Sequence, residues 1–553
     1  MAKKIPLSPE NIKKNIHTVQ RWMEQQEIDA LYVSSFDIWL NEYVPLENCP
    51  RFYITGFSGS VAEVLLERGK RVRLYVDGRY HQQADEEVDA DLIEVVKCAY
   101  GVSNKEKLKE DLACAQGPKL GLFASRTFLA DKLYFASAVS EVVSFSEEQL
   151  KGLIPLVTPQ ENCRVEYVDI SLTGKSTEDK LKEVLAADAG LFISQMDSLS
   201  WVINGRGYQL PYQSAVVAKG LATRDQVRLI ANGYAEDIPK LDLAKVSYDP
   251  QHISVTDFTT LTSLYGDALV EKPGGIQQQH AFKNPGEIKA MEKSFAKGDR
   301  GIFKTMQWVR ECYTNKKTFS ELDFYHCAEK NYRETGAKSQ SFHTIAGIGA
   351  NSAIIHFANP SAAVVVKEGD LLLLDSGGYW QSGFATDTTR VGVYAEQGTA
   401  EQKKLYTLVL QGLLRAQNAV FQKGTLGKEI DALARGPLQA AGLDYAHGTG
   451  HGVGINVHEG GYSLTPQSQI PLHAGLVGSI EPGVYIPGLG GIRLENIVAV
   501  EELPDDPNRL RFRPLVFIGF EPKLIDYNLL NGQEQAWLAN YEKTCEVHGT
   551  SFL

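Results

Sequence analysis

The stretch HGTGHGVGINVHE, residues 447–459, contains three of the chain's twelve histidines, His447, His451 and His458. Its four alternating glycines disfavour a helix, because each glycine costs helix stability. His447 and His451 are therefore not the helical pair of an HExxH zinc motif. In an extended chain they lie roughly 13 Å apart, at about 3.3 Å per residue. Unless the chain folds back, at most one of them binds a given metal at a distance of about 2 Å.

The composition places this stretch in a large, acidic, globular protein. The chain has 553 residues and a net charge of -12, so we expect several domains and little affinity for nucleic acid or anionic membranes. Its first residues, MAKKIPLSPENIKKN, contain no apolar core, so we expect no secretory signal. The seven scattered cysteines form no CxxC pair. Together these features predict a cytoplasmic protein with reduced thiols.

Alternating helix and strand patterns predict two α/β domains, at residues 1–160 and 161–278. The first opens with a helix over 9–27, capped by Ser8, and continues with strands at DALYVSS (29–35) and RVRLYVDGRY (71–80). The second has a helix around 177–187 and strands at AGLFIS (189–194) and QVRLIA (226–231).

A third domain is predicted over residues 279–553. It opens with a long helix that has Pro285 near its start, followed by helices near 320–335, 401–422 and 427–441. The rest of this region is rich in strand patterns and glycine, and residues 522–553 form a polar and aromatic tail.

Two aspartates of the third domain flank a predicted hairpin. LLLLDSGGYWQSGFATDTTRVGVY, residues 371–394, places Asp375 at the end of an apolar run and Asp387 just before another. Two strands joined by a glycine-rich turn can bring both carboxylates together. The alternative is that both are turn residues, because Asp shortly before Gly is ordinary turn chemistry.

Two glutamates repeat the arrangement in SIEPGVYIPGLGGIRLENIVAV, residues 479–500. Glu481 directly follows an apolar run. Glu495 is expected within an apolar strand, on the face opposite Leu494. If that face is interior, an unpaired carboxylate is costly unless it binds a metal. The alternative is a glutamate on a solvated sheet face.

In chain order these residues are two aspartates, a histidine and two glutamates. Four carboxylates and one imidazole are too few for two separate closed sites, but they suit two adjacent divalent cations that share bridging carboxylates. Oxygen-rich ligation favours Mn, with Zn, Co or Fe as alternatives. A two-metal site of this kind activates water and polarises a carbonyl, which is hydrolytic chemistry.

The motifs DSGG, TDTTR, HGTGHGVG, VHE, SIEPGVY and GIRLEN resemble, in order and spacing, those of the pita-bread metallopeptidase family. The resemblance implies two creatinase-like α/β domains followed by a pita-bread catalytic domain of α+β type. It also implies two metal ions, with Asp387 and Glu495 bridging them and Glu481 acting as general base. The implied ligands are Asp375, Asp387, His451, Glu481 and Glu495.

Within that family the chain is most similar to the long, three-domain Xaa-Pro aminopeptidases. RFYITGFSGSVAEVLL, MDSLSWVINGRGYQLPYQSAVV, NSAIIHFANP and the tail LIDYNLLNGQEQAWLANYEK carry this likeness over nearly the whole chain. It implies that His356, His447 and His458 line the substrate site and act in catalysis. Arg79 would approach the substrate from the first domain, or else form a structural salt bridge, and Arg493 would orient a carboxylate.

The predicted activity is hydrolysis of the bond between an N-terminal residue and a following proline, in peptides with a free N-terminus. One alternative is a prolidase that cleaves only Xaa-Pro dipeptides. Another is a non-catalytic peptide-binding protein on the same fold. The resemblance further implies a homodimer. One departure is that Asp375 and Asp387 are twelve residues apart, one more than expected of the family. The loop YWQSGFA is expected to carry the extra residue, and the ligand assignment holds if this loop bulges outward.

Overall fold

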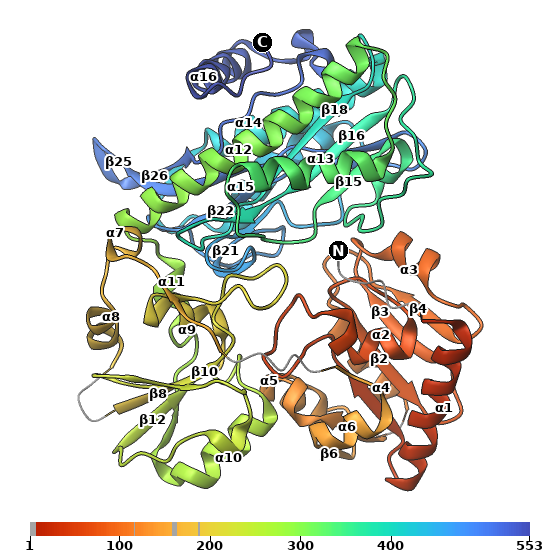
Figure 1. The fold of residues 1–553 in the computed structure, drawn as a ribbon, viewed down its shortest axis with the longest axis vertical. Helices are drawn as coiled ribbons and strands as arrows, with labels where there is room; N and C mark the ends of the chain where they lie inside the picture. Colours follow the sequence, from red (N-terminus) through yellow and green to blue (C-terminus); the bar gives the residue numbers. More distant parts are fainter. Residues whose placement is uncertain (1–6, 116, 158–162, 186–188) are drawn as a thin grey trace. The chain divides into compact units, whose positions relative to one another are not determined.

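The computed structural model describes residues 7–115, 117–157, 163–185 and 189–553. The chain divides into two compact units (Figure 1). Unit 1 comprises residues 1–166, 176–210 and 216–276, and unit 2 comprises 167–175, 211–215 and 277–553. The division of the first 278 residues into two domains stays a prediction, and its boundary at residue 160 lies outside the described residues.

Unit 1 contains a six-stranded mixed sheet built from the apolar runs near its N-terminus. Both faces are covered by helices, and two groups of buried aliphatic and aromatic side chains lie against it. In spatial order the strands are β4 (Ile93–Lys97), β3 (Val72–Val76), β2 (Glu63–Glu67), β1 (Ala30–Val33), β5 (Lys119–Phe123) and β6 (Glu141–Phe145).

A second mixed sheet in unit 1 has five strands. Its order is β11 (Val227–Ile230), β10 (Lys219–Thr223), β8 (Ala189–Ile193), β12 (Lys245–Tyr248) and β13 (Leu269–Glu271). The two sheets and their helices confirm the expected α/β character of this part of the chain.

Four helices of unit 1 begin at a serine whose side chain caps the first turn, namely α1 (Pro9–Gln25), α6 (Glu147–Leu153), α8 (Thr177–Val184) and α10 (Val255–Tyr265). Ser8 caps the first helix by accepting a hydrogen bond from the Asn11 amide at 3.3 Å, as predicted. The other longer helices are α2 (Pro50–Thr55), α3 (His81–Glu87), α4 (Asn104–Cys114), α5 (Leu129–Ala136) and α9 (Met196–Ile203). The end predicted for α8, residues 186–187, lies outside the described residues.

Unit 2 opens with a 30-residue helix, α12 (Pro285–Thr314). Asn284 caps it and Glu287 completes a capping box. The next helix, α13 (Glu321–Glu334), packs beside α12 (Figure 1). The other helices of this unit are α7 (Ile170–Thr173), α11 (Gln277–Ala281), α14 (Ala400–Gln417), α15 (Gly427–Ala440) and α16 (Gly532–His548).

The strands of unit 2 pair antiparallel throughout the described ladders. One sheet has the order β15 (Ile345–Ile348), β16 (Leu371–Ser376), β18 (Thr388–Val393). The larger sheet has the order β19 (Val420–Gln422), β26 (Asp506–Pro514), β25 (Asn496–Leu503), β22 (Val477–Ile480), β20 (Gly450–Gly452), β21 (Glu459–Leu464). Two-stranded pairs are formed by β14 (Ser339–Gln340) with β17 (Gly378–Tyr379), and β23 (Gly483–Ile486) with β24 (Gly490–Arg493).

Helix α14 is almost wholly buried among these strands, and its apolar residues are part of the main core of unit 2. Helices packed on curved antiparallel sheets confirm the α+β catalytic domain. One local prediction was wrong: the helix predicted to reach residue 422 ends at Gln417 and is followed by β19. Most of the tail, for which no element was predicted, forms α16.

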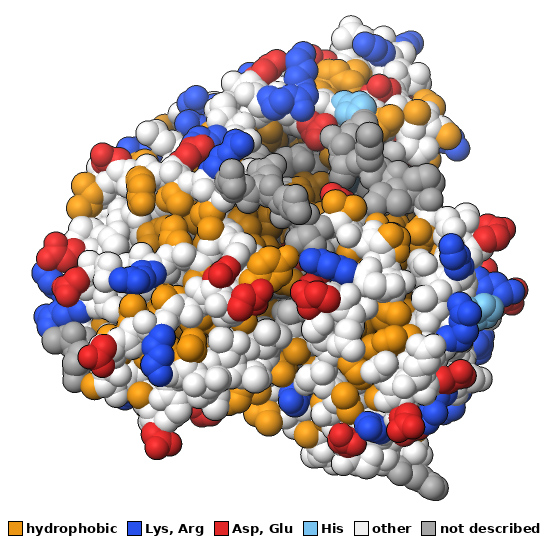
Figure 2. Space-filling model, turned by 60° about the horizontal axis from the view of Figure 1, so that its bottom comes forward, with side chains coloured by type: hydrophobic (Ala, Val, Ile, Leu, Met, Phe, Trp, Pro, Cys, Tyr) orange, Lys and Arg blue, Asp and Glu red, His pale blue; other side chains and the backbone are white. Residues whose placement is uncertain are grey.

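No helix among the described residues is long and apolar enough to cross a membrane. On the face that Figure 2 presents, Lys and Arg side chains are interspersed with Asp and Glu side chains.

Candidate metal centre

The hairpin predicted for the two aspartates forms from β16 and β18. Asp375 pairs with Thr389 across the ladder, and Asp387 directly precedes β18. The intervening loop does not bulge outward. Trp380 and Phe384 are buried, and the left-handed Gly383 (φ 68°) closes a tight turn. The extra residue is therefore accommodated inside the fold.

The two glutamates lie at the ends of a second antiparallel pair. Ile480 of β22 pairs with Asn496 of β25, so Glu481 and Glu495 are the next residues at that end of the ladder. The single strand predicted through Glu495 is instead interrupted, because Leu494 and Glu495 belong to neither β24 nor β25. Both side chains are buried. The Glu495 amide donates to the Thr389 carbonyl at 3.2 Å, which joins this pair to the aspartate hairpin.

His451, on β20, lies between the two pairs of carboxylates. Its Nε2 atom is 3.4 Å from Oδ2 of Asp387 and 3.3 Å from Oε1 of Glu481. Donor atoms of Asp387, His451 and Glu495 all lie within 4.8 Å of one another. The other ring nitrogen, Nδ1, donates to the Gly452 carbonyl at 3.1 Å, because a carbonyl can only accept. This bond holds the ring so that Nε2 faces the carboxylates.

The pKa values of the cluster reflect several carboxyl groups that are buried close to one another. Burial raises the pKa of Asp375 to about 7, although Arg493 opposes the shift. Burial, together with the charge of Asp387, raises the pKa of Glu495 well above its usual value. In contrast, the bond from His451 overcomes burial and lowers the pKa of Glu481 to about 2. Burial by itself would lower the pKa of His451. The hydrogen bonds to Asp387 and Glu481 outweigh burial, and they raise this pKa well above its usual value.

Two carboxylate atoms of the cluster are left as open acceptors. Oδ1 of Asp375 and Oε1 of Glu495 are buried and have no hydrogen-bond partner among the described residues. Buried acceptors of this kind normally find a donor or a cation. Two divalent cations would balance the four carboxylates, and the oxygen-rich donor set suits hard or borderline metals. The residues therefore fit a dinuclear metal centre.

Arg493 links the carboxylates to the rest of the site. It is 2% exposed, and its Nη2 atom donates to Oδ2 of Asp375 at 2.6 Å. Its Nε atom donates to the Thr389 hydroxyl at 3.1 Å, and that hydroxyl donates to Oε2 of Glu495 at 2.9 Å. Its Nη1 atom donates to the Tyr485 hydroxyl at 2.8 Å. One guanidinium thus orients two carboxylates and one phenol.

Tyr485 is a site residue that the sequence reasoning missed. Its hydroxyl lies 2.8 Å from Nε2 of His447, whose Nδ1 donates to the Gly448 carbonyl at 2.8 Å. Burial lowers the pKa of His447 to about 4, so the neutral ring accepts a hydrogen bond from Tyr485. In the sequence, the local sign of this role is that Tyr485 follows Glu481 by four residues. It lies on β23, which pairs with the strand that ends at Arg493. Both ring nitrogens of His447 therefore have protein partners.

The other two predicted histidines also lie near this network. The ring of His458 packs at right angles against that of His451, with centroids 4.3 Å apart. His356 follows Ile355, whose carbonyl accepts from Arg493 at 3.4 Å. The neighbour of His458, Glu459, accepts bonds from Lys283 at 2.7 Å and from the Ile455 amide at 2.6 Å, which fixes the loop.

Arg79 belongs to unit 1. Its Nε and Nη2 atoms donate to the two oxygens of Asp77 at 2.9 Å and 2.8 Å. Its role near a substrate stays a prediction.

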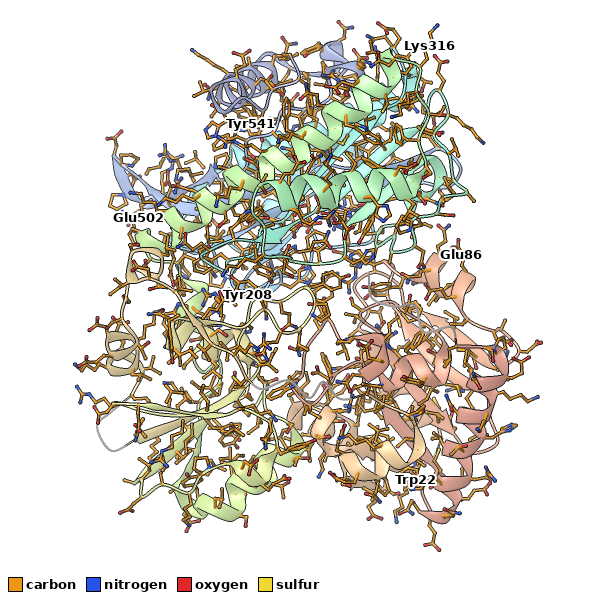
Figure 3. All side chains as sticks on the ribbon, in the orientation of Figure 1. Trp22, Glu86, Tyr208, Lys316, Glu502 and Tyr541 are labelled. Atoms are coloured by element: carbon orange, nitrogen blue, oxygen red, sulfur yellow. The ribbon has the colours of Figure 1, made fainter. Side chains whose placement is uncertain are left out.

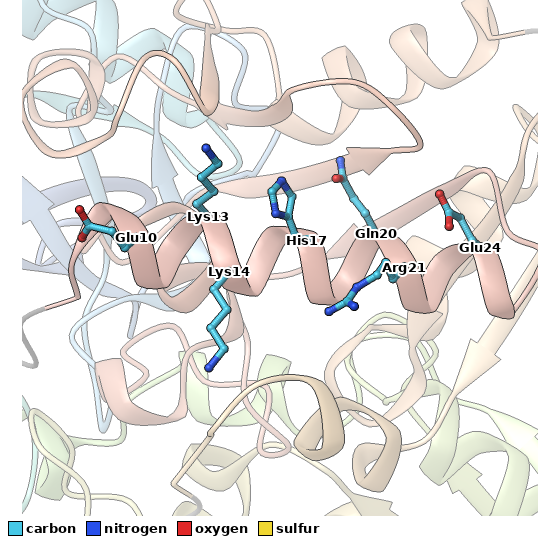
Figure 4. A pocket seen from close by; sticks show the side chains of 7 residues that line it. All are labelled: Glu10, Lys13, Lys14, His17, Gln20, Arg21 and Glu24. Atoms are coloured by element: carbon cyan, nitrogen blue, oxygen red, sulfur yellow. The ribbon is translucent and has the colours of Figure 1, made fainter.

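A surface depression along α1 is a different kind of feature (Figure 4). All the residues that line it belong to this one helix, and most of them are exposed. They are Glu10, Lys13, Lys14, His17, Gln20, Arg21 and Glu24. Figure 4 shows these side chains spreading from the helix instead of converging on a point, so they do not form a cluster that could hold a ligand.

Comparison with known proteins identifies two families along the chain. The profile of Metallopeptidase family M24 matches residues 289–502, and that of the Creatinase/Prolidase N-terminal domain matches residues 16–147. A probable Xaa-Pro aminopeptidase P of Paracoccidioides brasiliensis is 30% identical, over 94% of this chain and 93% of the relative. Aminopeptidase P2 of Arabidopsis thaliana is 29% identical, over 93% of this chain and 82% of the relative.

The fold has a solved counterpart in X-prolyl aminopeptidase from Caenorhabditis elegans, described as a cytosolic enzyme with a di-nuclear active site. The TM-score is 0.86 at 22% identity, and the match covers 97% of this chain and 96% of that one. At this sequence identity the likeness shows the fold alone. In the present chain, the creatinase-like domain and the M24 domain follow each other along the sequence.

Proposed function

The chain belongs to the Xaa-Pro aminopeptidase P family of M24 metallopeptidases, and on this premise we propose how its residues hydrolyse the bond before a penultimate proline. The observation that carries the proposal is the convergence of the two aspartates, the two glutamates and His451 from two separate strand pairs. Buried carboxylates with open acceptor atoms are arranged for cations.

We assign two divalent metal ions to this cluster. Asp375, Asp387, His451, Glu481 and Glu495 would hold them, and Asp387 and Glu495 would be shared between the two. Mn is the favoured metal because the donors are mostly oxygens, and Zn, Co and Fe are the alternatives. When bound, such a pair supplies an activated water and a Lewis acid for the scissile carbonyl.

Other steps of the reaction, proton transfer and binding of the substrate, are assigned to side chains of the protein. Glu481 would accept a proton from the attacking water as the general base. His458 and His356 donate to the peptide and to the oxygen that gains negative charge. His447 acts on the substrate side through its bond with Tyr485.

Selectivity for proline follows from the substrate. The bond before proline is a tertiary amide without an N–H, and its ring fixes the backbone angle. A site whose histidines and aromatic side chains enclose that ring recognises its shape, whereas a site built to bind an amide N–H does not.

We also propose a cytoplasmic homodimer that binds neither nucleic acid nor membranes. The seven cysteines are free thiols, which agrees with a reducing compartment. The net charge of -12 repels polyanions. The dimer rests on the family resemblance.

The test is metal analysis combined with cleavage assays. We expect the wild type to bind two Mn ions per chain and to cleave Xaa-Pro-Yaa peptides, and we expect chelation to abolish and Mn to restore the activity. Asp387→Ala should lose both properties, whereas Asp505→Ala, an exposed control, should retain them. Cleavage of Xaa-Pro dipeptides alone would indicate a prolidase. Absence of bound metal and of any stability gain with Mn would indicate a non-catalytic binder.

A further inference from the structure

Arg390 is a second buried arginine next to the metal centre, on the opposite side of β18 from Thr389. It is 1% exposed and lies three residues after Asp387. Strand alternation directs Thr389, which bonds Glu495, to one face and Arg390 to the other. The mechanism does not use Arg390, yet burying a guanidinium is costly unless its donors are satisfied.

Part of the Arg390 guanidinium holds the chain at Glu495. Its Nη1 atom donates to the backbone carbonyl of Glu495 at 2.5 Å, and its Nη2 atom donates to Oδ1 of Asn496 at 2.7 Å. Leu494 and Glu495 lie in the break between β24 and β25, where their amides donate to the Pro482 and Thr389 carbonyls, at 3.2 Å in each case. The Arg390 guanidinium adds the hydrogen bond that holds the carbonyl of Glu495.

The rest of the guanidinium binds the C-terminal segment, residues 515–553. Nη2 donates to the Ile518 carbonyl at 2.8 Å and to the Tyr541 hydroxyl of α16 at 3.0 Å. The ring of Phe520 lies 4.8 Å from the guanidinium carbon. Tyr541 (labelled in Figure 3) is 6% exposed, and its hydroxyl also lies 3.2 Å from Oδ1 of Asn496.

We propose that the C-terminal segment is a positioning element of the metal centre, in which Tyr541 acts through Arg390 and Asn496 on the carboxylate of Glu495. The proposal rests on the metal-binding function assigned above. Its physical basis is that partners beyond the ligands fix the orientation of the ligands, and their loss typically weakens metal binding by about 10- to 100-fold. Tyr541 touches no ligand side chain, so its effect reaches the metals only through backbone placement.

The segment is anchored independently of Tyr541. The Phe517 amide donates to Oδ2 of Asp299 at 2.8 Å, and the Glu521 amide donates to the Tyr406 hydroxyl at 2.9 Å. Removal of one hydroxyl should therefore leave the segment docked. A variant that lacks only this hydroxyl can therefore distinguish a positioning role of Tyr541 from a role in folding.

The experiment compares Tyr541→Phe with Tyr527→Phe, an exposed tyrosine of the same segment. Chelator-stripped full-length proteins are titrated with Mn²⁺ by calorimetry, and their melting temperatures are measured with and without Mn²⁺. We expect Tyr541→Phe to weaken Mn²⁺ binding about 10-fold and to shrink the metal-induced gain in melting temperature. Tyr527→Phe should match the wild type in both measurements.

A purely structural role predicts a different result. If Tyr541→Phe lowers the melting temperature of the metal-free protein but leaves the Mn²⁺ dissociation constant unchanged, the inference is overturned. Should that variant fail to fold, Phe520→Leu removes the ring beside Arg390 and is expected to weaken Mn²⁺ binding in the same direction; unchanged affinity there overturns the inference equally. A wild type that binds no Mn²⁺ would instead refute the proposed function itself.

Discussion

Arg493 donates from Nη2 to Oδ2 of Asp375 at 2.6 Å, while Oδ1 of the same carboxylate has no hydrogen-bond partner among the described residues. One oxygen is thus committed to the protein and the other is left for a cation. The same guanidinium reaches Thr389 and Tyr485 through its other nitrogens. A planar fork with five donors can make these contacts together, but a point charge cannot.

Arg493→Lys should therefore impair the enzyme despite keeping the charge. Lysine cannot reach Asp375, Thr389 and Tyr485 at once, so at least one group loses its orientation. We expect kcat/KM for an Xaa-Pro-Yaa peptide to fall about 10- to 100-fold. Arg513→Lys, at a partly exposed ion pair, is the matched control and should change kcat/KM little. Equal activity of the two variants would contradict the role of Arg493.

Tyr485→Phe should reduce turnover more than substrate binding. The hydroxyl bridges Arg493 and His447, and its loss frees the imidazole of His447 from its fixed orientation. We expect kcat to fall about 10-fold, with little change in KM. His447→Gln should give a similar loss, and the double variant should be little worse than either single variant because the two residues act as a unit. Strictly additive losses in this cycle would refute the coupling.

Glu495→Gln should uncouple stability from metal binding. In the metal-free protein Glu495 is buried among Asp387, Glu481 and Asp375, and its pKa is raised by burial and by their charges. The amide removes this repulsion and still accepts from Thr389, so the metal-free melting temperature should hold or rise. The stabilisation by Mn and the activity should disappear. Glu501→Gln, on the neighbouring strand β25, should leave both intact. A marked fall in the metal-free melting temperature would contradict the assigned repulsion.

Glu63 gives unit 1 a pH dependence. Burial raises its pKa from 4.5 to about 7, although Lys105 opposes the shift, and Tyr32 donates to it at 2.6 Å. Below pH 4.5 both the folded and the unfolded state hold the proton. As the pH rises from 4.5 through about 7 the unfolded state ionises first, so the contribution of this carboxyl to stability is lost over that window.

Relative to Glu63→Gln, the wild type should lose about 3 kcal/mol of unfolding free energy across that range, at about 1.4 kcal/mol per pH unit. Urea unfolding at several pH values, followed through the transition of unit 1, measures the difference. Glu141→Gln, an exposed glutamate of β6, should follow the wild type. Parallel profiles for wild type and Glu63→Gln would show that Glu63 ionises normally.

The sequence by itself determined what depends on neighbours along the chain. Alternating glycines excluded a helix around His451, Ser8 marked the start of α1, and the apolar runs around Asp375 and Asp387 predicted a hairpin. Side-chain chemistry in chain order was enough to indicate a dinuclear hydrolase. These inferences succeed because capping, strand alternation and turn formation are set by residues within a few positions of each other.

Only the tertiary structure decided which distant groups meet. Tyr485 joins His447 across 38 residues, and Arg390 joins Tyr541 across 151. The interruption of the strand at Glu495 and the formation of α16 from the tail were also not predicted. No local pattern specifies such partners, because they are selected by the packing of whole strands and helices and by the need to satisfy every buried donor.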